Sequence, residues 1–156
     1  MGNTPLHQAC LNERPKVVLA LSASGADIDA RNYAWNTPLL VAVHAGNIAC
    51  ARALLSAGAR YDLPDEDGNT PLHIACANGD HAIVHLLCTV SMGVDIFNLA
   101  GFTPLHLAAK GGYAKCVRYL LLAGADPQLP NKADQPRRFS YASPIICIAR
   151  SLEFSN

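Results

Sequence analysis

Histidine and cysteine are the residue types in this chain whose spacing could support chemistry. A His-x-x-Cys pair occurs at residues 7–10 and again at 73–76. His81, His85 and Cys88 are spaced so that one face of a helix would present all three. Imidazole and thiolate groups in such arrangements are typical zinc ligands. Whether these groups bind a metal depends on the elements that position them.

Those elements follow from a tetrapeptide that recurs every 33 residues. Its copies are Thr4-Pro5-Leu6-His7, Thr37-Pro38-Leu39-Leu40, Thr70-Pro71-Leu72-His73 and Thr103-Pro104-Leu105-His106. Each Thr is placed as a helix N-cap, and each Pro takes the first helical position. A second apolar stretch follows each copy, with residues such as Ile83, Val84 and Leu87 spaced as in the buried stripe of an amphipathic helix. A fixed period of this length predicts stacked helix pairs rather than one globular core.

These repeated residues resemble those of the ankyrin-repeat family. An alanine follows each tetrapeptide at the family position, and a Gly-Ala-Asp-like tail follows each second helix. The tails are Gly25-Ala26-Asp27, Gly58-Ala59-Arg60, Gly93-Val94-Asp95 and Gly124-Ala125-Asp126. The resemblance implies an all-α ankyrin-repeat solenoid of helix-turn-helix units with projecting β-hairpin loops. It predicts one domain over residues 1–156, with repeats at about 2–33, 34–66, 67–99 and 100–132.

Two segments depart from the strict repeat. Two extra residues precede Gly93, which predicts a longer second helix or loop in the third unit. After an insertion at 135–141, Ser143-Pro144-Ile145-Ile146 echoes the tetrapeptide. We therefore expect a partial fifth repeat or capping helix at about 143–153, covering the end of the fourth unit.

The resemblance assigns the tetrapeptide histidines to structure. In the family this imidazole joins adjacent repeats by hydrogen bonds to the backbone and to Thr, a role that fits His7, His73 and His106. Leu40 and Ile146 replace it in two copies, so packing must substitute there. Both His-x-x-Cys pairs are then explained by repeat positions.

The histidines of the third unit's second helix are also better explained without a metal. Cys88 falls at a core position, whereas His81 and His85 lie on the outer helix, where a solvated face is the preferred interpretation over zinc. The sequence contains no Gly-rich phosphate loop and supports no Ser-His-Asp or Cys-His catalytic set. We therefore predict no metal, no cofactor, no catalytic residue and no enzymatic activity for this segment.

Charge and cysteine usage restrict the compartment and the partner. Lys plus Arg and Asp plus Glu each number 12, so net charge gives no reason to expect nucleic acid. Membrane insertion is not expected, since no run of 18 apolar residues occurs. Cysteines at equivalent core positions, such as Cys10 and Cys76 or Cys50 and Cys116, lie a repeat or more apart and are poorly placed for disulfides. They predict a reducing compartment, cytoplasmic and/or nuclear.

The first unit is unusually apolar. It starts at its own N-cap, and its second helix carries Lys16-Val17-Val18-Leu19-Ala20-Leu21, with few polar positions to face water. Terminal repeats need a polar outer face, so we expect a monomeric module within a larger protein. The alternative, that Met1 is a true start and that Glu13, Arg14 and Lys16 suffice as a cap, stays open.

Binding is the function that remains. In the family, partners usually contact the concave face made by the loop tips and the first helices. Carried over position by position, the predicted partner-binding residues are Tyr33, Trp35, Asn36, His44, Glu66, Asp67, Asn69, Asn78, Leu99, Phe102 and Lys110. Trp35 stands where the family has Gly, and it either contacts a partner or packs on the neighbouring loop. One loop is acidic through Asp62, Asp65, Glu66 and Asp67, and it either docks a basic segment or is a solvated turn.

The leading functional hypothesis is a protein–protein interaction module of an intracellular scaffold, adaptor or regulator. The alternative is a targeting or substrate-recognition domain attached to a catalytic domain outside this segment, such as a ubiquitin ligase, kinase or phospholipase. A unit that binds a small molecule between loops is a third, less supported hypothesis. Arg137-Arg138-Phe139-Ser140 resembles the recognition site of basophilic kinases, which predicts phosphorylation at Ser140 unless this is an unmodified solvated loop.

Overall fold

The computed structural model of the protein describes residues 1–91 and 93–134. These residues form eight α-helices and one short 3-10 helix, and they contain no β-strand. The helices are α1 (Pro5–Leu11), α2 (Pro15–Ala23), α3 (Pro38–His44), α4 (Ile48–Ser56), α5 (Pro71–Asn78), α6 (His81–Val90), α7 (Pro104–Lys110) and α8 (Ala114–Leu122), followed by η1 (Lys132–Asp134). The all-α solenoid predicted from the repeat is confirmed.

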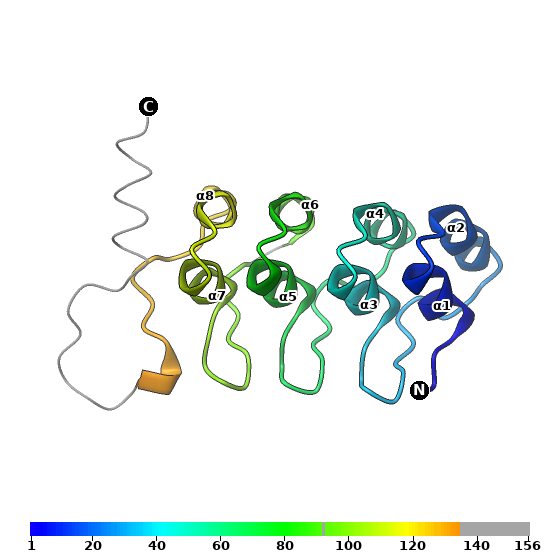
Figure 1. Ribbon diagram of the computed structural model, residues 1–156, viewed down its shortest axis with the longest axis horizontal. Helices are drawn as coiled ribbons and strands as arrows, with labels where there is room; N and C mark the ends of the chain where they lie inside the picture. Colours follow the sequence, from blue (N-terminus) through cyan, green and yellow to red (C-terminus); the bar gives the residue numbers. More distant parts are fainter. Residues whose placement is uncertain (92, 135–156) are drawn as a thin grey trace.

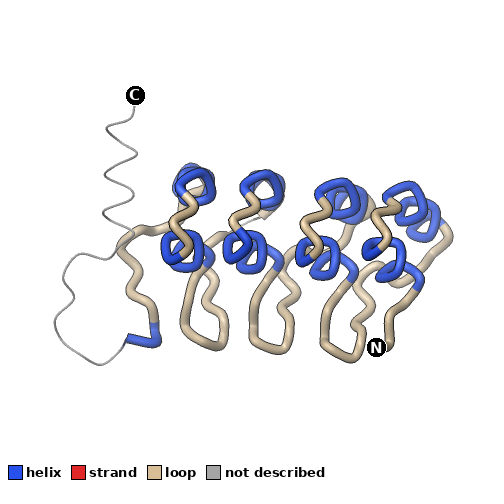
Figure 2. Tube along the Cα trace, in the orientation of Figure 1, coloured by secondary structure: helices blue, strands red, loops and turns tan. Residues whose placement is uncertain are grey.

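The helices lie in two rows (Figure 1). One row, called here the inner row, contains α1, α3, α5 and α7, and the outer row contains α2, α4, α6 and α8. Long loops project from the side of the inner row (Figure 2). We call them the first finger (27–36), the second finger (60–69) and the third finger (93–102).

The fingers are hairpin turns without strands. Each tip closes through two backbone hydrogen bonds. The N–H of Asn32, Asp65 or Asn98 donates to the carbonyl four residues later, and the carbonyl of the same residue accepts from the N–H of Trp35, Gly68 or Gly101. These bonds close a tight turn and do not extend into a strand ladder. The loops therefore project as expected, but they lack the regular β pairing that the word hairpin implies.

The tetrapeptides start the inner helices as predicted. Thr4, Thr37, Thr70 and Thr103 are the N-caps of α1, α3, α5 and α7, with extended backbone, and Pro follows each of them. Three of these threonines are buried, and the leucine of every copy is buried too. Each unit thus places polar capping groups inside the stack, where neighbours must satisfy them.

The core lies between the two rows and runs along the whole stack. Apolar residues of the outer helices face it at helical spacing, including Val18, Leu54, Leu87 and Leu120, all fully buried. One helix pair could not bury this stripe alone, because the atoms that cover it belong to the next pair.

The third unit absorbs its extra residues partly in α6. This helix has 10 residues, whereas α2, α4 and α8 have 9 each. The longer second helix is therefore confirmed. The predicted insertion at 135–141, the capping helix at 143–153 and Ser140 lie outside the described residues, and the predicted repeat boundaries stay predictions.

Candidate protein-interaction surface

Large apolar side chains are exposed at the finger tips. Tyr33 and Trp35 of the first finger are 84% and 59% exposed, and Leu99 of the third finger is 80% exposed. The second finger reaches the third through a 3.0 Å hydrogen bond from the Leu99 N–H to the carbonyl of Asp67. The first and third fingers thus present apolar side chains to water in the free protein.

Trp35 adopts a backbone conformation that residues other than glycine rarely adopt. Its φ is +59°, in the left-handed region, and the equivalent residues of the next two fingers are Gly68 and Gly101, with φ of +77° and +83°. A side chain in this region is disfavoured relative to glycine. The tryptophan therefore needs a compensating contact.

Arg31 supplies that contact. Its guanidinium carbon lies 5.0 Å from the centre of the Trp35 ring, within cation–π range. Its Nη1 also donates hydrogen bonds of 2.6 Å to the carbonyls of Trp35 and Pro64. Arg31 belongs to the same finger as Trp35, so this contact is not the expected packing on a neighbouring loop. Because Trp35 is still 59% exposed, contact with a partner stays a prediction. Sequence reasoning missed Arg31, although an arginine four residues before a finger-tip tryptophan was a readable signal.

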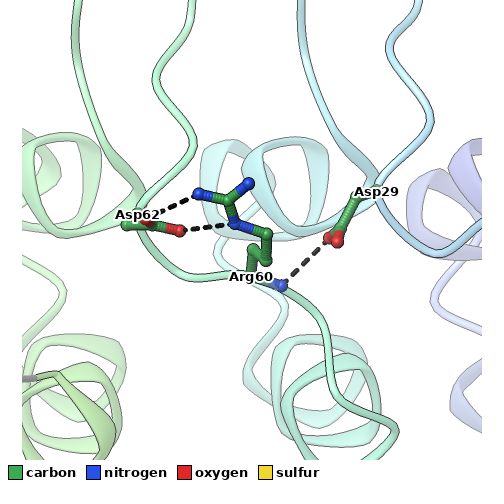
Figure 3. Close-up of polar contacts among 3 residues, drawn as sticks. All are labelled: Asp29, Arg60 and Asp62. Carbon is green, nitrogen blue, oxygen red and sulfur yellow. Dashed lines mark hydrogen bonds and ion pairs between the residues drawn. The ribbon is translucent and has the colours of Figure 1, made fainter.

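Some carboxylates of the acidic loop bond to other groups of the protein, and others are exposed without an ion pair. Asp62 accepts two hydrogen bonds from Arg60 at 2.9 and 3.0 Å, and these bonds lower the pKa of Asp62. The Arg60 N–H donates to Asp29 of the first finger (Figure 3). Asp65 uses one carboxylate oxygen to accept the N–H groups of the tip. Glu66 and Asp67 are exposed, and their carboxylates make no ion pair with any described residue.

Three of the predicted site residues are half-buried. Asn69 bridges fingers, since its amide nitrogen faces Asp65 and its Oδ1 accepts from Asn98 at 2.8 Å. The backbone carbonyl of Asn36 accepts a hydrogen bond from His7 at 2.9 Å. Phe102 packs with its ring 6.2 Å from that of His106. The stack partly covers all three residues, although Asn36 contributes its backbone carbonyl rather than its side chain.

The remaining predicted residues lie at the ends of inner helices. His44, Asn78 and Lys110 are the last residues of α3, α5 and α7, and all three are exposed. The Lys110 ammonium lies 5.8 Å from the centre of the Phe102 ring. The structure therefore places the predicted residues on the fingers and at the ends of the inner helices, with the most exposed apolar groups at the finger tips.

The histidines of α6 do not converge with other ligands. His81 and His85 are exposed, and the His85 ring lies 4.7 Å from that of Tyr119. Cys88 packs against the core, and burial raises the pKa of its thiol to about 11. Within residues 1–91 and 93–134, no three His, Cys, Asp or Glu side chains are grouped to hold a metal ion.

No described helix is long and apolar enough to cross a membrane.

The described cysteines are free thiols that meet across repeats. Burial raises the pKa of Cys10 to about 12, and the neighbouring Cys50 of the next unit contributes to that shift. Burial likewise raises the pKa of Cys76, with Cys116 as its neighbour. The sequence comparison of equivalent cysteines missed these pairs, because they join an inner helix to the outer helix of the following unit.

Two models of the ankyrin-repeat family together match most of this chain. Residues 39–131 match a family model described as ankyrin repeats (3 copies), and residues 6–55 match one described as ankyrin repeats (many copies). A curated human protein, SMC5-SMC6 complex localization factor protein 1, is 42% identical over 52 residues. That match covers 33% of this chain and 5% of the human protein, so the chain spans a small part of the relative's length.

Proposed function

Because the chain belongs to the ankyrin-repeat family, a non-catalytic interaction fold, we propose that it recruits a protein partner through its finger tips and inner helices. Its role is that of an interaction module in an intracellular scaffold, adaptor or regulator, in the cytoplasm or nucleus. The observation that carries this proposal is the exposure of Tyr33 and Trp35 on the first finger and of Leu99 on the third finger. Aromatic side chains of this kind supply most of the binding energy at many interfaces.

The charges around these side chains favour a basic partner segment. Glu66 and Asp67 lie on the second finger, between the apolar tips of the first and third fingers. Their carboxylates are not neutralised by a described cation, so a Lys or Arg of the partner would complement them. We propose an extended peptide that carries a basic residue flanked by apolar anchors, rather than nucleic acid.

The name of the human relative describes a localization factor for the SMC5-SMC6 complex, which is also a recruitment role. In the targeting hypothesis, any chemistry associated with this module would belong to an attached domain. The targeting hypothesis differs from the scaffold hypothesis only in what is attached. Both use the same finger surface, and one binding experiment tests the surface for both.

The test is selection of peptides from a displayed random library against the full chain. Selected peptides should be enriched in Lys or Arg next to aromatic or aliphatic residues. Leu99→Ser should then weaken their binding by about tenfold, the equivalent of about 1.4 kcal/mol. Leu122→Ser is the matched control, because Leu122 is 76% exposed on the outer row, away from the fingers.

Two outcomes would contradict the proposal. Equal losses for Leu99→Ser and Leu122→Ser would show that the peptides recognise exposed leucine rather than the finger surface. Selection of acidic peptides would contradict the assignment of Glu66 and Asp67. Trp35→Gly offers a second variant, since glycine occupies the equivalent positions 68 and 101 and the finger should keep its shape.

A further inference from the structure

The solenoid has three described joints between successive helix pairs. The first joint lies between α1–α2 and α3–α4, the second between α3–α4 and α5–α6, and the third between α5–α6 and α7–α8. Equivalent positions can be compared across the joints, because the repeat is regular in this part of the chain. The comparison shows that the second joint is built differently.

A histidine crosses the first and third joints. His7 Nε2 contacts the carbonyl of Asn36 at 2.9 Å, and His73 Nε2 contacts the carbonyl of Phe102 at 3.0 Å. In each case Nδ1 accepts from the backbone N–H of the N-cap Thr, which places the ring proton on Nε2 for donation to the carbonyl. Leu40 occupies this position at the second joint and cannot donate.

An asparagine pair repeats the pattern. Asn32 Nδ2 donates to Asn3 Oδ1 at 2.9 Å across the first joint, and Asn98 Nδ2 donates to Asn69 Oδ1 at 2.8 Å across the third. The equivalent pair at the second joint is Asn36 and Asp65. A carboxylate has no proton to donate, and Asn36 Oδ1 is buried without a hydrogen-bond partner.

The finger backbones show the same difference. The Tyr33 N–H donates to the carbonyl of Met1, and the Leu99 N–H donates to that of Asp67. The corresponding bond from Glu66 to Ala34 is absent among the described residues.

Trp35 explains why this backbone bond is missing. A Cβ on Gly68 would lie 2.9 Å from the Leu99 nitrogen, so the close approach of the second and third fingers requires glycine. Trp35 carries a Cβ and a ring at the equivalent position of the first finger, where the same approach is blocked.

The outer helices α4 and α6, which meet at the second joint, contact each other less than α2 and α4 or α6 and α8 do. A groove of about 530 Å³ lies over α4 and α6 and reaches Tyr119 of α8. It is lined by Ile48, Arg52, His81, Ala82, His85, Leu86, Thr89 and Tyr119. Two partly exposed side chains of the first finger form hydrogen bonds across this joint. Arg31 Nη1 donates to the Pro64 carbonyl, and Asp29 accepts from the Arg60 N–H.

We propose that the second joint is the flexible joint of this solenoid, at which a half containing α1–α4 moves and unfolds independently of a half containing α5–α8. The stability of a repeat array is approximately a sum of unit terms and nearest-neighbour interface terms, so one weak interface uncouples the two sides. Apolar contacts such as those of Leu40 still cover the joint. They do not fix the orientation of one helix pair relative to the next, as hydrogen bonds do. This inference does not depend on the proposed function, because it concerns the free protein.

The buried thiols provide probes for each half. Cys10 and Cys50 lie together at the first joint, and Cys76 and Cys116 lie together at the third. All four side chains are fully buried. Pulsed alkylation of the full chain across a urea series, read by peptide mass spectrometry, therefore gives a separate unfolding midpoint for each half.

The experiment destabilises one half and observes the other. Leu105→Ala, in α7, should lower the midpoint of Cys76 and Cys116 and leave that of Cys10 and Cys50 unchanged. Leu6→Ala, in α1, is the matched variant and should have the opposite pattern. Equal shifts of both cysteine pairs in either variant would overturn the flexible joint.

Restoring the missing hydrogen bonds tests their role. In a Leu40→His/Asp65→Asn background, Leu105→Ala should lower both midpoints, because the restored bonds couple the halves. Asp65→Asn alone keeps the Oδ1 that accepts the N–H groups of the finger tip, so it should give partial coupling even where the double variant folds poorly. The mirror variant Asn98→Asp should loosen the third joint, so that Cys116 becomes reactive at lower urea than Cys76. Unchanged coupling in both Asp65→Asn and the double variant would show that these bonds do not set the joint.

Discussion

The N-termini of α3 and α5 begin with the same three residues and differ at the fourth, Leu40 in one and His73 in the other. Both side chains are fully buried. The His73 ring contacts the Thr70 hydroxyl at 2.9 Å, accepts from the Thr70 N–H and donates to the next finger. At α3 the Thr37 hydroxyl accepts the Leu40 N–H at 3.2 Å instead, and the leucine side chain adds only apolar contacts.

Burial alone therefore does not describe how two repeats are joined. The leucine contributes hydrophobic free energy that is insensitive to direction. The histidine contributes hydrogen bonds that fix the position of the next finger and that become unfavourable if one member is removed. The two helices should consequently respond differently to equivalent substitutions.

The largest effect is expected from His73→Ala. It creates a cavity and leaves the buried Thr70 hydroxyl and the Phe102 carbonyl without their partner, which should cost about 3–5 kcal/mol of unfolding free energy. His73→Leu fills most of the cavity and should cost about 1–3 kcal/mol, because only the unpaired polar groups remain. Urea denaturation gives both values. A cost near zero for His73→Leu would mean that the hydrogen bonds contribute nothing beyond packing.

A smaller effect is expected at the N-cap threonines. Thr70→Ala should destabilise the protein by about 1 kcal/mol, the usual effect of a lost cap. Thr37→Ala should have a similar effect, since its hydroxyl also accepts a backbone N–H. Thr70→Ala in the His73→Leu background should cost less than in the wild type, because the threonine has already lost its imidazole partner. Additive costs would contradict coupling between the two side chains.

A further difference between α3 and α5 should appear with pH. Burial lowers the pKa of His73 from its ordinary value of 6.5. Below pH 6.5 His73 binds a proton in the unfolded chain but stays neutral in the folded protein. The stability that His73 contributes is therefore full above pH 6.5, and it falls as the pH drops toward the pKa of His73 in the folded protein. His73→Leu should reduce this loss, whereas Leu40→Val, which removes no titratable group, should keep the wild-type slope. Unfolding free energies between pH 7.5 and 5 measure both.

The sequence predicted the features that depend on local rules. Thr and Pro set where each inner helix begins, and the apolar spacing sets which face it buries. The fold therefore followed from the repeated tetrapeptide. The exposure of Tyr33 and Leu99 followed from their place at finger tips. The features that depend on neighbouring fingers were not foreseen, although the alignment of Asn32, Asp65 and Asn98 contained the difference. A buried amide without a partner is visible only once the next finger is placed against it.

The smallest effect, and the most informative for the fingers, is expected from Trp35→Gly. Relief of the left-handed conformation should stabilise the protein by about 1–2 kcal/mol. Loss of the Arg31 cation–π contact should remove about 0.5–1 kcal/mol, and the greater freedom of glycine in the unfolded chain removes about 0.4–1 kcal/mol. The net change should lie within about 1 kcal/mol of zero by the same estimates. In an Arg31→Ala background the cation–π contact is already gone, so Trp35→Gly should become stabilising. A tryptophan held mainly by apolar packing would instead give the same loss of stability in both backgrounds, measured by circular dichroism in urea.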